Sequence, residues 1–357
     1  MEKKTEDGKN NSSKILNGIS MDTKLLLFDG TYKLCYQITD TDLLMGDDCQ
    51  SRHIVSRKKL IPEESKLYRI SQNKGINYVI NQDNYISLKL SRLRHKKDTV
   101  NVGGREIAKN EILDIRLSDY LKMSKTSQMD FKAYKVAIDC KSQPLLCDPY
   151  IMGLWLMDAS VSENELTISD IPILEECFNI VKEKKMTLDY LKGNRYGLNY
   201  EDVNKNFNIH VLEKLNLLKT TKFIPVEYKI NSKENRLRLL AGMIDCQGTR
   251  NNNCYELTIK NEVLADDIVF ICNSLGLYSS KTNQKRKTHY FRIIISGDLS
   301  EIPVINEKKK IPIRKQIKNV LHTGVTIEHL SDINSCYELV VDGNGRFLTS
   351  DFTVLHC

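Results

Sequence analysis

The chain has 357 residues, of which 41% are hydrophobic and 28% are charged. This length predicts two or three domains, and the composition is typical of a core-forming protein rather than a disordered chain. The formal net charge of +7 is a modest basic excess, which permits nucleic-acid binding without demonstrating it. Long apolar runs and a secretory signal are both missing, so we expect no membrane association.

The first part of the chain is rich in short β-type runs. We expect residues 1–17 to be a disordered tail, because they are polar. LLLF ends in the turn signal Asp29-Gly30, and the runs HIVSRKKL, LYRISQ, YVIN and YISLKL follow at short intervals. Such frequent short strands predict an all-β sandwich or barrel-like domain. Further on, EILDIRLSDYLKMS has helix-like apolar spacing over residues 112–123, and FKAYKVAID is typical of a strand.

The pattern changes near residue 145. Asp148-Pro149 predicts the start of a helix that continues through YIMGLWLMD, and residues 172–186 predict another. Helices and strands intermix until about residue 298. The chain then returns to β-type runs: TIEHL, CYELVV, the turn DGNG, RFLTS and FTVLH. This order predicts one domain inserted into another, with the last strands completing the sheets of the first.

An internal repeat is the most informative feature of the sequence. IMGLWLMDA begins at residue 151 and LAGMIDCQG begins 89 residues later, at 240, each with a glycine, Gly153 or Gly242, in third place. A helical glycine costs about 1 kcal/mol relative to alanine, but it lets two helices approach closely. We therefore expect the two helices to pack together and to place Asp158 next to Gln247. Acidic groups at that place could hold a divalent metal against a phosphate. The alternative is two unrelated amphipathic helices.

The repeat resembles the motifs of the LAGLIDADG homing endonucleases. RLLAGMIDCQG (238–248) is similar to their signature, KFIPVEYKI (222–230) to the usual lead-in, and IMGLWLMDA to a variant found in intein endonucleases. NEVLADDIVFICNSLGLYSS resembles the helix after the second motif. The flanks TKLLLFDGTYKL and CYELVVDGNGRFLTSDFTVLH resemble the terminal blocks of intein splicing (Hint) domains.

The resemblance implies a fold and a function. It implies a discontinuous, all-β, horseshoe-shaped Hint domain (residues 18–140 and 319–357) interrupted by an α+β, pseudo-twofold LAGLIDADG endonuclease domain (141–318). The two endonuclease halves would span about 145–230 and 231–318. It also implies a monomer that straddles double-stranded DNA and cleaves or nicks it at specific sites with Mg²⁺. The ten cysteines are scattered and show no metal-binding spacing. Because no secretory signal is present, we expect them to be reduced thiols in an intracellular protein, nuclear if genomic DNA is its target.

At the positions that the resemblance assigns to splicing, the side chains of this sequence cannot carry out the splicing reactions. Gly18 stands where the nucleophile is expected, and Asn81 and Asn84 stand in place of the Thr and His that assist it. At the other end, His356 is followed by Cys357 rather than by the asparagine that cyclises. We therefore expect splicing to be lost.

The resemblance assigns Asp158 and Gln247 to catalysis and metal binding. An amide brings an oxygen ligand but no charge. Asp245 lies two residues before Gln247, on another helix face, and is a poor substitute, and Ala159 replaces the usual glycine. Lys309, within the run 308–310, could stabilise charge on phosphate. The alternative for this run is a plain solvated surface.

Three basic clusters, within residues 92–97, 281–287 and 308–315, are candidates for phosphate contacts, although a single cluster of this kind is more often a solvated face. We assign DNA binding to six of their residues: Arg94, Lys96, Lys97, Lys285, Arg286 and Lys287. Two further functional alternatives remain. One is a DNA-binding protein without catalysis, and the other is an intein remnant without a selected function.

Overall fold

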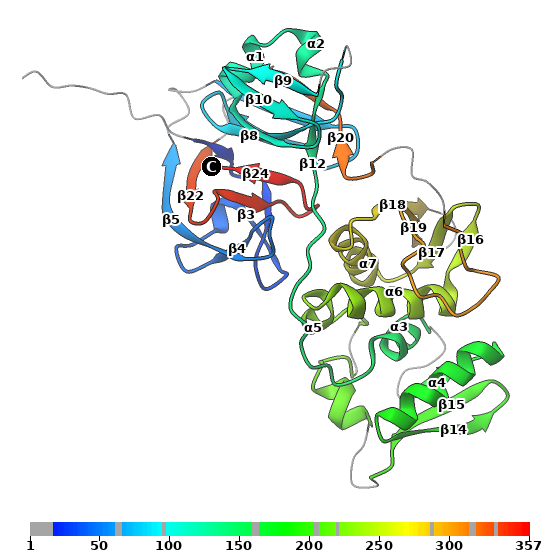
Figure 1. Ribbon diagram of the computed structural model, residues 1–357. Helices are drawn as coiled ribbons and strands as arrows, with labels where there is room; N and C mark the ends of the chain where they lie inside the picture. Colours follow the sequence, from blue (N-terminus) through cyan, green and yellow to red (C-terminus); the bar gives the residue numbers. More distant parts are fainter. Residues whose placement is uncertain are drawn as a thin grey trace, which may run out of the picture.

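The computed structural model describes residues 17–60, 66–94, 98–158, 164–202, 207–218, 221–285, 289–313, 319–331 and 335–357. Both ends of the chain build a mainly β part, and the middle of the chain builds a part with longer helices (Figure 1). None of the helices in these ranges is long and apolar enough to cross a membrane.

The β part combines elements from the two ends of the chain. Its N-terminal elements are β1 (Ile19–Ser20), β2 (Lys24–Leu26), β3 (Tyr32–Leu34), β4 (Leu43–Met45), β5 (Ser51–Leu60), β6 (Leu67–Gln72), β7 (Tyr78–Asn81), β8 (Tyr85–Leu90), β9 (Thr99–Val102), β10 (Arg105–Ala108), β11 (Ile112–Arg116), α1 (Leu117–Lys122), α2 (Lys125–Gln128) and β12 (Phe131–Tyr134). Its C-terminal elements are β20 (His322–Thr323), β21 (Val325–Leu330), β22 (Cys336–Val341), β23 (Arg346–Leu348) and β24 (Val354–His356).

The last strands complete sheets that the first strands begin. One sheet has the order β21-β6-β7-β1-β22-β5-β4, and another has the order β11-β8-β12-β20. In the first sheet β22 lies between β1 and β5, with Tyr337 opposite both Ile19 and Lys59. These pairings confirm the expected return of the C-terminal strands. The described strands form several open sheets, however, rather than a barrel.

Local sequence signals explain most of these elements. The Asp29-Gly30 signal forms the β2–β3 turn, in which Gly30 has a φ of +82° and the Asp29 carboxylate accepts a hydrogen bond of 2.9 Å from Thr31 N. The helix expected from residue 112 to residue 123 is wrong over its first part. Ile112–Arg116 is strand β11, paired along its whole length with β8, and α1 begins only at Leu117. Its β-branched residues favour pairing over the helix-like spacing.

The middle of the chain folds as two similar halves. The first contains α3 (Pro149–Met157), β13 (Glu165–Thr167), α4 (Ile171–Glu183), β14 (Met186–Lys192), β15 (Arg195–Tyr200) and a short π-helix, η3 (Asn208–Glu213). The second contains α5 (Val226–Lys229), α6 (Lys233–Gln247), β16 (Thr249–Asn251), β17 (Cys254–Ile259), α7 (Glu262–Ser274), β18 (Tyr278–Lys285) and β19 (His289–Ser296). Their sheets have the orders β13-β15-β14 and β16-β17-β19-β18, so β13, β14 and β15 correspond to β17, β18 and β19.

The β part and the helical part share a hydrophobic cluster. Leu26, Met45 and Phe352 of the β part belong to the same buried cluster as the core of α3, α6 and α7. The Phe270 ring on α7 lies 5.2 Å from the Phe352 ring and 6.1 Å from the Tyr32 ring, measured between centroids. The segment after β12 contacts the C-terminal end of α7, where Ile138 N donates to Ser274 O over 3.0 Å. These contacts hold the helical part against the β part.

Candidate active site

The site is built where α3 and α6 cross. Asp148 caps α3 by accepting a hydrogen bond of 2.8 Å from Tyr150 N, with Pro149 in the first turn, as the sequence predicts. Gly153 lies against α6: an added Cβ would be 2.9 Å from Met243 N and closer still to Leu239 O. Gly242 lies reciprocally against α3, where a Cβ would meet Tyr150 C at 3.0 Å and Tyr150 O closer still. The close packing of the two repeat helices is thereby confirmed.

This crossing brings the ends of the two motifs together. Asp158 is the C-cap of α3, and Gln247 is the last residue of α6. Both residues line the same two cavities, which have volumes of about 370 Å³ and 260 Å³. The Asp158 side chain is buried and its Oδ2 accepts a hydrogen bond of 2.7 Å from Thr167 N, whereas Gln247 is exposed. The two residues therefore share a site but differ in charge and in environment.

Lys222 is a site residue that the sequence reasoning missed. Its Nζ donates to Trp155 O over 2.6 Å and to Asp158 O over 2.8 Å, and it lies 4.1 Å from the centroid of the buried Trp155 ring. Lys222 also lines the larger of the two cavities. Burial lowers the pKa of Lys222 to about 8, although the charge of Asp158 acts in the opposite direction. An ammonium group thus lies beside Asp158, which is the only carboxylate among the described residues that line this cavity.

Lys309 occupies the corresponding place in the second half. Its Nζ donates to Ile244 O over 2.9 Å and to Asp245 O over 2.7 Å, and burial lowers its pKa. By contrast, Lys308 and Lys310 are exposed. Lys309 is therefore not part of a plain solvated run. A repeat in the sequence marks both lysines, since Lys222-Phe-Ile-Pro is followed 87 residues later by Lys309-Lys-Ile-Pro.

Asp245 has a structural role that differs from the role of Asp158 at the end of the first motif. Its Oδ2 accepts hydrogen bonds from Tyr150 Oη at 2.9 Å and from Ile305 N at 2.7 Å, and its Oδ1 accepts from Asn306 N at 3.2 Å. These bonds fix the segment that leads to Lys309. Burial raises the pKa of Asp245. Its oxygens are committed to this segment, which agrees with the expectation that Asp245 is a poor substitute for an acid at position 247.

The donor set at the motif ends fits a metal ion that a substrate would complete. In the ranges that the structure describes, no three His, Cys, Asp or Glu side chains are grouped so as to hold a metal. Mg²⁺ is commonly bound by one or two carboxylates together with substrate phosphates and water. Asp158 supplies a carboxylate and Gln247 supplies an amide oxygen, so the site fits such an ion but not one held by protein groups alone.

The residues assigned to the first splicing step meet at the start of β1. Gly18 N donates to Asn81 Oδ1 over 2.9 Å, and Asn84 Nδ2 donates to Gly18 O over 3.0 Å. Both asparagines are buried. The structure thus brings together the three residues that the resemblance aligns, and amides hold the Gly18 backbone from both sides.

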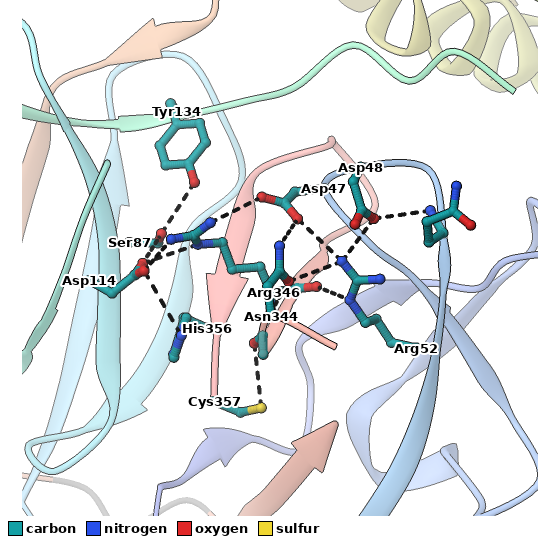
Figure 2. A network of polar contacts seen from close by, with 12 residues as sticks. Asp47, Asp48, Arg52, Ser87, Asp114, Tyr134, Asn344, Arg346, His356 and Cys357 are labelled. Carbon is teal, nitrogen blue, oxygen red and sulfur yellow. Dashed lines mark hydrogen bonds and ion pairs between the residues drawn. The ribbon is translucent and has the colours of Figure 1, made fainter. Parts of the chain in front are cut away.

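His356 and Cys357 lie in the polar network that Figure 2 shows around Asp114 and Arg346. His356 Nε2 is 4.0 Å from Asp114 Oδ2, and burial lowers the pKa of His356. Burial would raise the pKa of Asp114, but hydrogen bonds from Arg346 and Ser87 outweigh it and hold that pKa below its usual value. The Cys357 Sγ accepts a hydrogen bond of 3.3 Å from Val341 N, and burial raises the pKa of its thiol.

The basic residues assigned to DNA binding are only partly described. Lys96, Lys97, Arg286 and Lys287 lie outside the described residues, as does the side chain of Lys285 at the end of β18. Arg94 makes an ion pair of 2.7 Å with Asp130 and donates to Thr126 O, so its guanidinium already has structural partners. A cavity of about 830 Å³, against the segment 319–324, is lined by further basic side chains: Lys74, Lys109, Lys132 and His322.

Comparison with known proteins gives partial similarities. No protein-family model matches the chain. The chain is 28% identical over 151 residues to the replicative DNA helicase DnaB of Mycobacterium intracellulare, which is 42% of this chain but 22% of the helicase. The matched part therefore spans about a fifth of that relative.

Three solved structures of the homing endonuclease I-DmoI also resemble part of the chain. Each match covers 42% of this chain. A structure of mesophilic variants matches with a TM-score of 0.31 and 15% identity, over 82% of that chain. The complex with DNA and Ca matches with a TM-score of 0.31 and 14% identity, over 82% of that chain. The complex with DNA and Mn matches with a TM-score of 0.30 and 16% identity, over 88% of that chain.

Proposed function

We propose that this chain is an intein-derived, two-motif LAGLIDADG-type DNA endonuclease whose splicing-type domain no longer splices. The observation that carries the proposal is the crossing of α3 and α6 through Gly153 and Gly242. That crossing gives Asp158 and Gln247 two shared cavities. A half-buried lysine is bonded to the end of each motif helix, Lys222 to α3 and Lys309 to α6.

The substrate that suits this arrangement is duplex DNA. Two sheets related by an internal repeat offer similar surfaces to the two strands of a duplex. The net charge of +7 and the basic cavity lined by Lys74, Lys109 and Lys132 support contacts to the phosphate backbone. Because such contacts release counterions, binding should weaken steeply with added salt.

The chemistry that suits the site is metal-assisted hydrolysis of a phosphodiester. Asp158 and Gln247 would hold Mg²⁺, which when bound neutralises charge on the scissile phosphate. Lys222 would stabilise negative charge that develops on the same phosphate, and the carbonyls of Trp155 and Asp158 orient its ammonium group. Lys309 would act in the same way on the other strand.

The two halves of the site should differ in activity. Asp158 brings a charged ligand, whereas Gln247 brings only an amide oxygen. The second motif end therefore lacks a carboxylate that could bind the metal ion. Asp245 does not replace it, because its oxygens accept hydrogen bonds from the backbone of residues 305 and 306. We infer that the protein nicks its site or cleaves it slowly, rather than making efficient double-strand breaks.

Loss of splicing follows from the chemistry of the residues at the ancestral junctions. Gly18 has no nucleophile, and Asn84 cannot act as an imidazole base at the adjacent peptide. Cys357 follows His356, so asparagine cyclisation has no substrate there.

Selection of bound duplexes from a random DNA library tests this proposal. The expected result is an enriched sequence that, carried on a supercoiled plasmid, is nicked in the presence of Mg²⁺ and not in the presence of a chelator. Enrichment without nicking would favour the second candidate, a DNA-binding protein without catalysis, which the neutral Gln247 supports. A library without enrichment, together with binding that is insensitive to salt, would contradict both.

A further inference from the structure

An asparagine followed directly by a glycine occurs at two places in the sequence, Asn17-Gly18 and Asn344-Gly345. This dipeptide is prone to deamidation, because glycine has no side chain that shields its backbone nitrogen from the preceding side-chain amide. In an open chain the glycine nitrogen attacks the asparagine Cγ and closes a succinimide ring. The structure holds both dipeptides, but it holds them at different atoms.

At Asn17-Gly18 the structure holds the attacking nitrogen. Gly18 is buried, and its N donates to Oδ1 of the buried Asn81 over 2.9 Å. Gly18 O accepts hydrogen bonds of 3.0 Å from Asn81 N and from Asn84 Nδ2. The next residue, Ile19, is paired with strands on both of its sides, β7 and β22. Turning the Gly18 nitrogen toward the Asn17 amide would break the bond to Asn81.

At Asn344-Gly345 the structure instead holds the amide that would be attacked. Asn344 Nδ2 donates to Asp47 Oδ1 over 2.8 Å, and its Oδ1 accepts from Arg52 and from Arg346 N, each over 3.0 Å (Figure 2). Asn17 lies outside this network and has intermediate exposure, so water can reach its side chain.

We propose that Asn17 is a latent deamidation site and that Asn81 acts as a clamp that prevents the reaction in the folded chain. The pair Asn81 and Asn84 then has a protective role, which needs hydrogen bonding to a backbone peptide but no acid–base chemistry. Local opening of β1 releases the clamp, and the modification therefore records how often this strand opens.

The reaction consumes one water molecule and releases one ammonia molecule. Gly18 N loses its proton and forms a bond to Asn17 Cγ, while the bond from Cγ to Nδ2 breaks and the leaving nitrogen takes up protons as ammonia. Water then opens the imide. Cleavage of the ring at Cγ gives aspartate at position 17, and cleavage at the backbone carbonyl gives isoaspartate, which adds one carbon to the main chain. Either product places a carboxylate directly before β1.

Incubation of the native full-length chain at mildly alkaline pH tests the proposal, with digestion by an acid protease and high-resolution mass spectrometry of the peptides. Asn17 should react much more slowly than in the same chain unfolded in urea. Asn81→Ala should raise the rate at Asn17 about fivefold, the effect of one typical hydrogen bond on a local opening equilibrium. Asn84→Ala, which keeps the bond from Gly18 N, should have a smaller effect.

The second dipeptide is an internal control for folding. The rate at Asn344 in Asn81→Ala should equal its rate in the unmodified chain, because its own partners are intact. In the matched variant Asp47→Ala, which removes a partner of Asn344, the rate at Asn344 should rise while the rate at Asn17 stays constant.

Three outcomes would overturn the proposal. One is deamidation of Asn17 in the native chain as fast as in urea, which would show that the fold gives no protection. Another is an unchanged rate at Asn17 in Asn81→Ala. The third is an equal rise at Asn17 and Asn344 in that variant, which would assign the effect to general loosening of the β part rather than to the clamp.

Discussion

Gly153 and Gly242 each lie against the main chain of the opposite helix, so neither position has room for a side chain. A Cβ at Gly153 would meet Leu239 O and Met243 N, and backbone atoms of a packed helix cannot move aside cheaply. The same relationship holds at Gly242 with Tyr150 and Leu154. Two helices that cross this closely fix the positions of Asp158 and Gln247 at their ends.

We expect Gly153→Ala and Gly242→Ala each to lower the free energy of unfolding by about 3 kcal/mol or more, because overpacking here displaces backbone. Urea denaturation measures the effect. Gly197→Ala in β15 is the matched control, since its Cβ would lie at an ordinary 3.6 Å from Leu191 Cδ2. Equal stability of all three variants would contradict the close crossing.

The half-buried Lys222 predicts a pH dependence of cleavage. Its pKa is lowered to about 8, so its ammonium form, which stabilises phosphate charge, is lost as the pH rises through that value. The ratio of the nicking rate of the unmodified protein to that of Lys222→Met should therefore fall as the pH rises from one unit below to one unit above this pKa. Changes of pH also affect the ionisation of the attacking water and the binding of the metal ion, but they affect both proteins alike. The ratio of the two rates therefore isolates the contribution of Lys222. A ratio that stays constant would mean that the charge of Lys222 plays no part.

Asp114 predicts an acid sensitivity of the β part. The hydrogen bonds from Arg346 and Ser87 outweigh its burial and keep its folded-state pKa below the unfolded value. The folded chain therefore binds fewer protons at this group than the unfolded chain does. Its stabilising contribution is present above the unfolded pKa, about 4, and is lost as the pH falls through the folded pKa. Thermal unfolding of Asp114→Asn should show lower stability at neutral pH and a weaker acid dependence. An unchanged acid dependence would assign the effect to other carboxylates.

We expect the chain to give no ligated product when reporter segments are fused to both of its ends, as judged by mass spectrometry. Gly18→Cys alone should not restore splicing, because the later steps still lack an asparagine after His356. An active splicing domain between the same reporters is the positive control. Detection of joined reporters from the unmodified chain would refute the proposed loss of splicing.

Local signals and the internal repeat made much of the architecture predictable. The glycine in third place of each motif predicts the helix crossing, and the two β-rich ends predict that the last strands complete the sheets of the first, as the pairing of β22 with β1 and β5 does. The strand Ile112–Arg116 was not predicted, because its apolar spacing fits a helix and its pairing with β8 is set by tertiary structure. Periodicity alone cannot decide such a short stretch.

The candidate site was predictable only in part. Lys222 was missed although it shares a Lys-x-Ile-Pro pattern with Lys309, because that pattern was taken only as a lead-in to the second motif. Arg94 was assigned to phosphate binding, yet its partner Asp130 is 36 residues away and sequence spacing does not reveal such a pair.

Nicking of a supercoiled plasmid that carries the selected site tests the asymmetric endonuclease most directly. With Mg²⁺, the unmodified protein should accumulate nicked circles ahead of linear DNA, Asp158→Asn should abolish both products, and Gln247→Asp should raise the linear fraction. Binding of all three proteins to the site, measured in parallel, controls for folding. Linear product that forms as fast as nicked circles in the unmodified protein, or full activity of Asp158→Asn, would contradict the assignment of Asp158 and Gln247 as unequal halves of one active site.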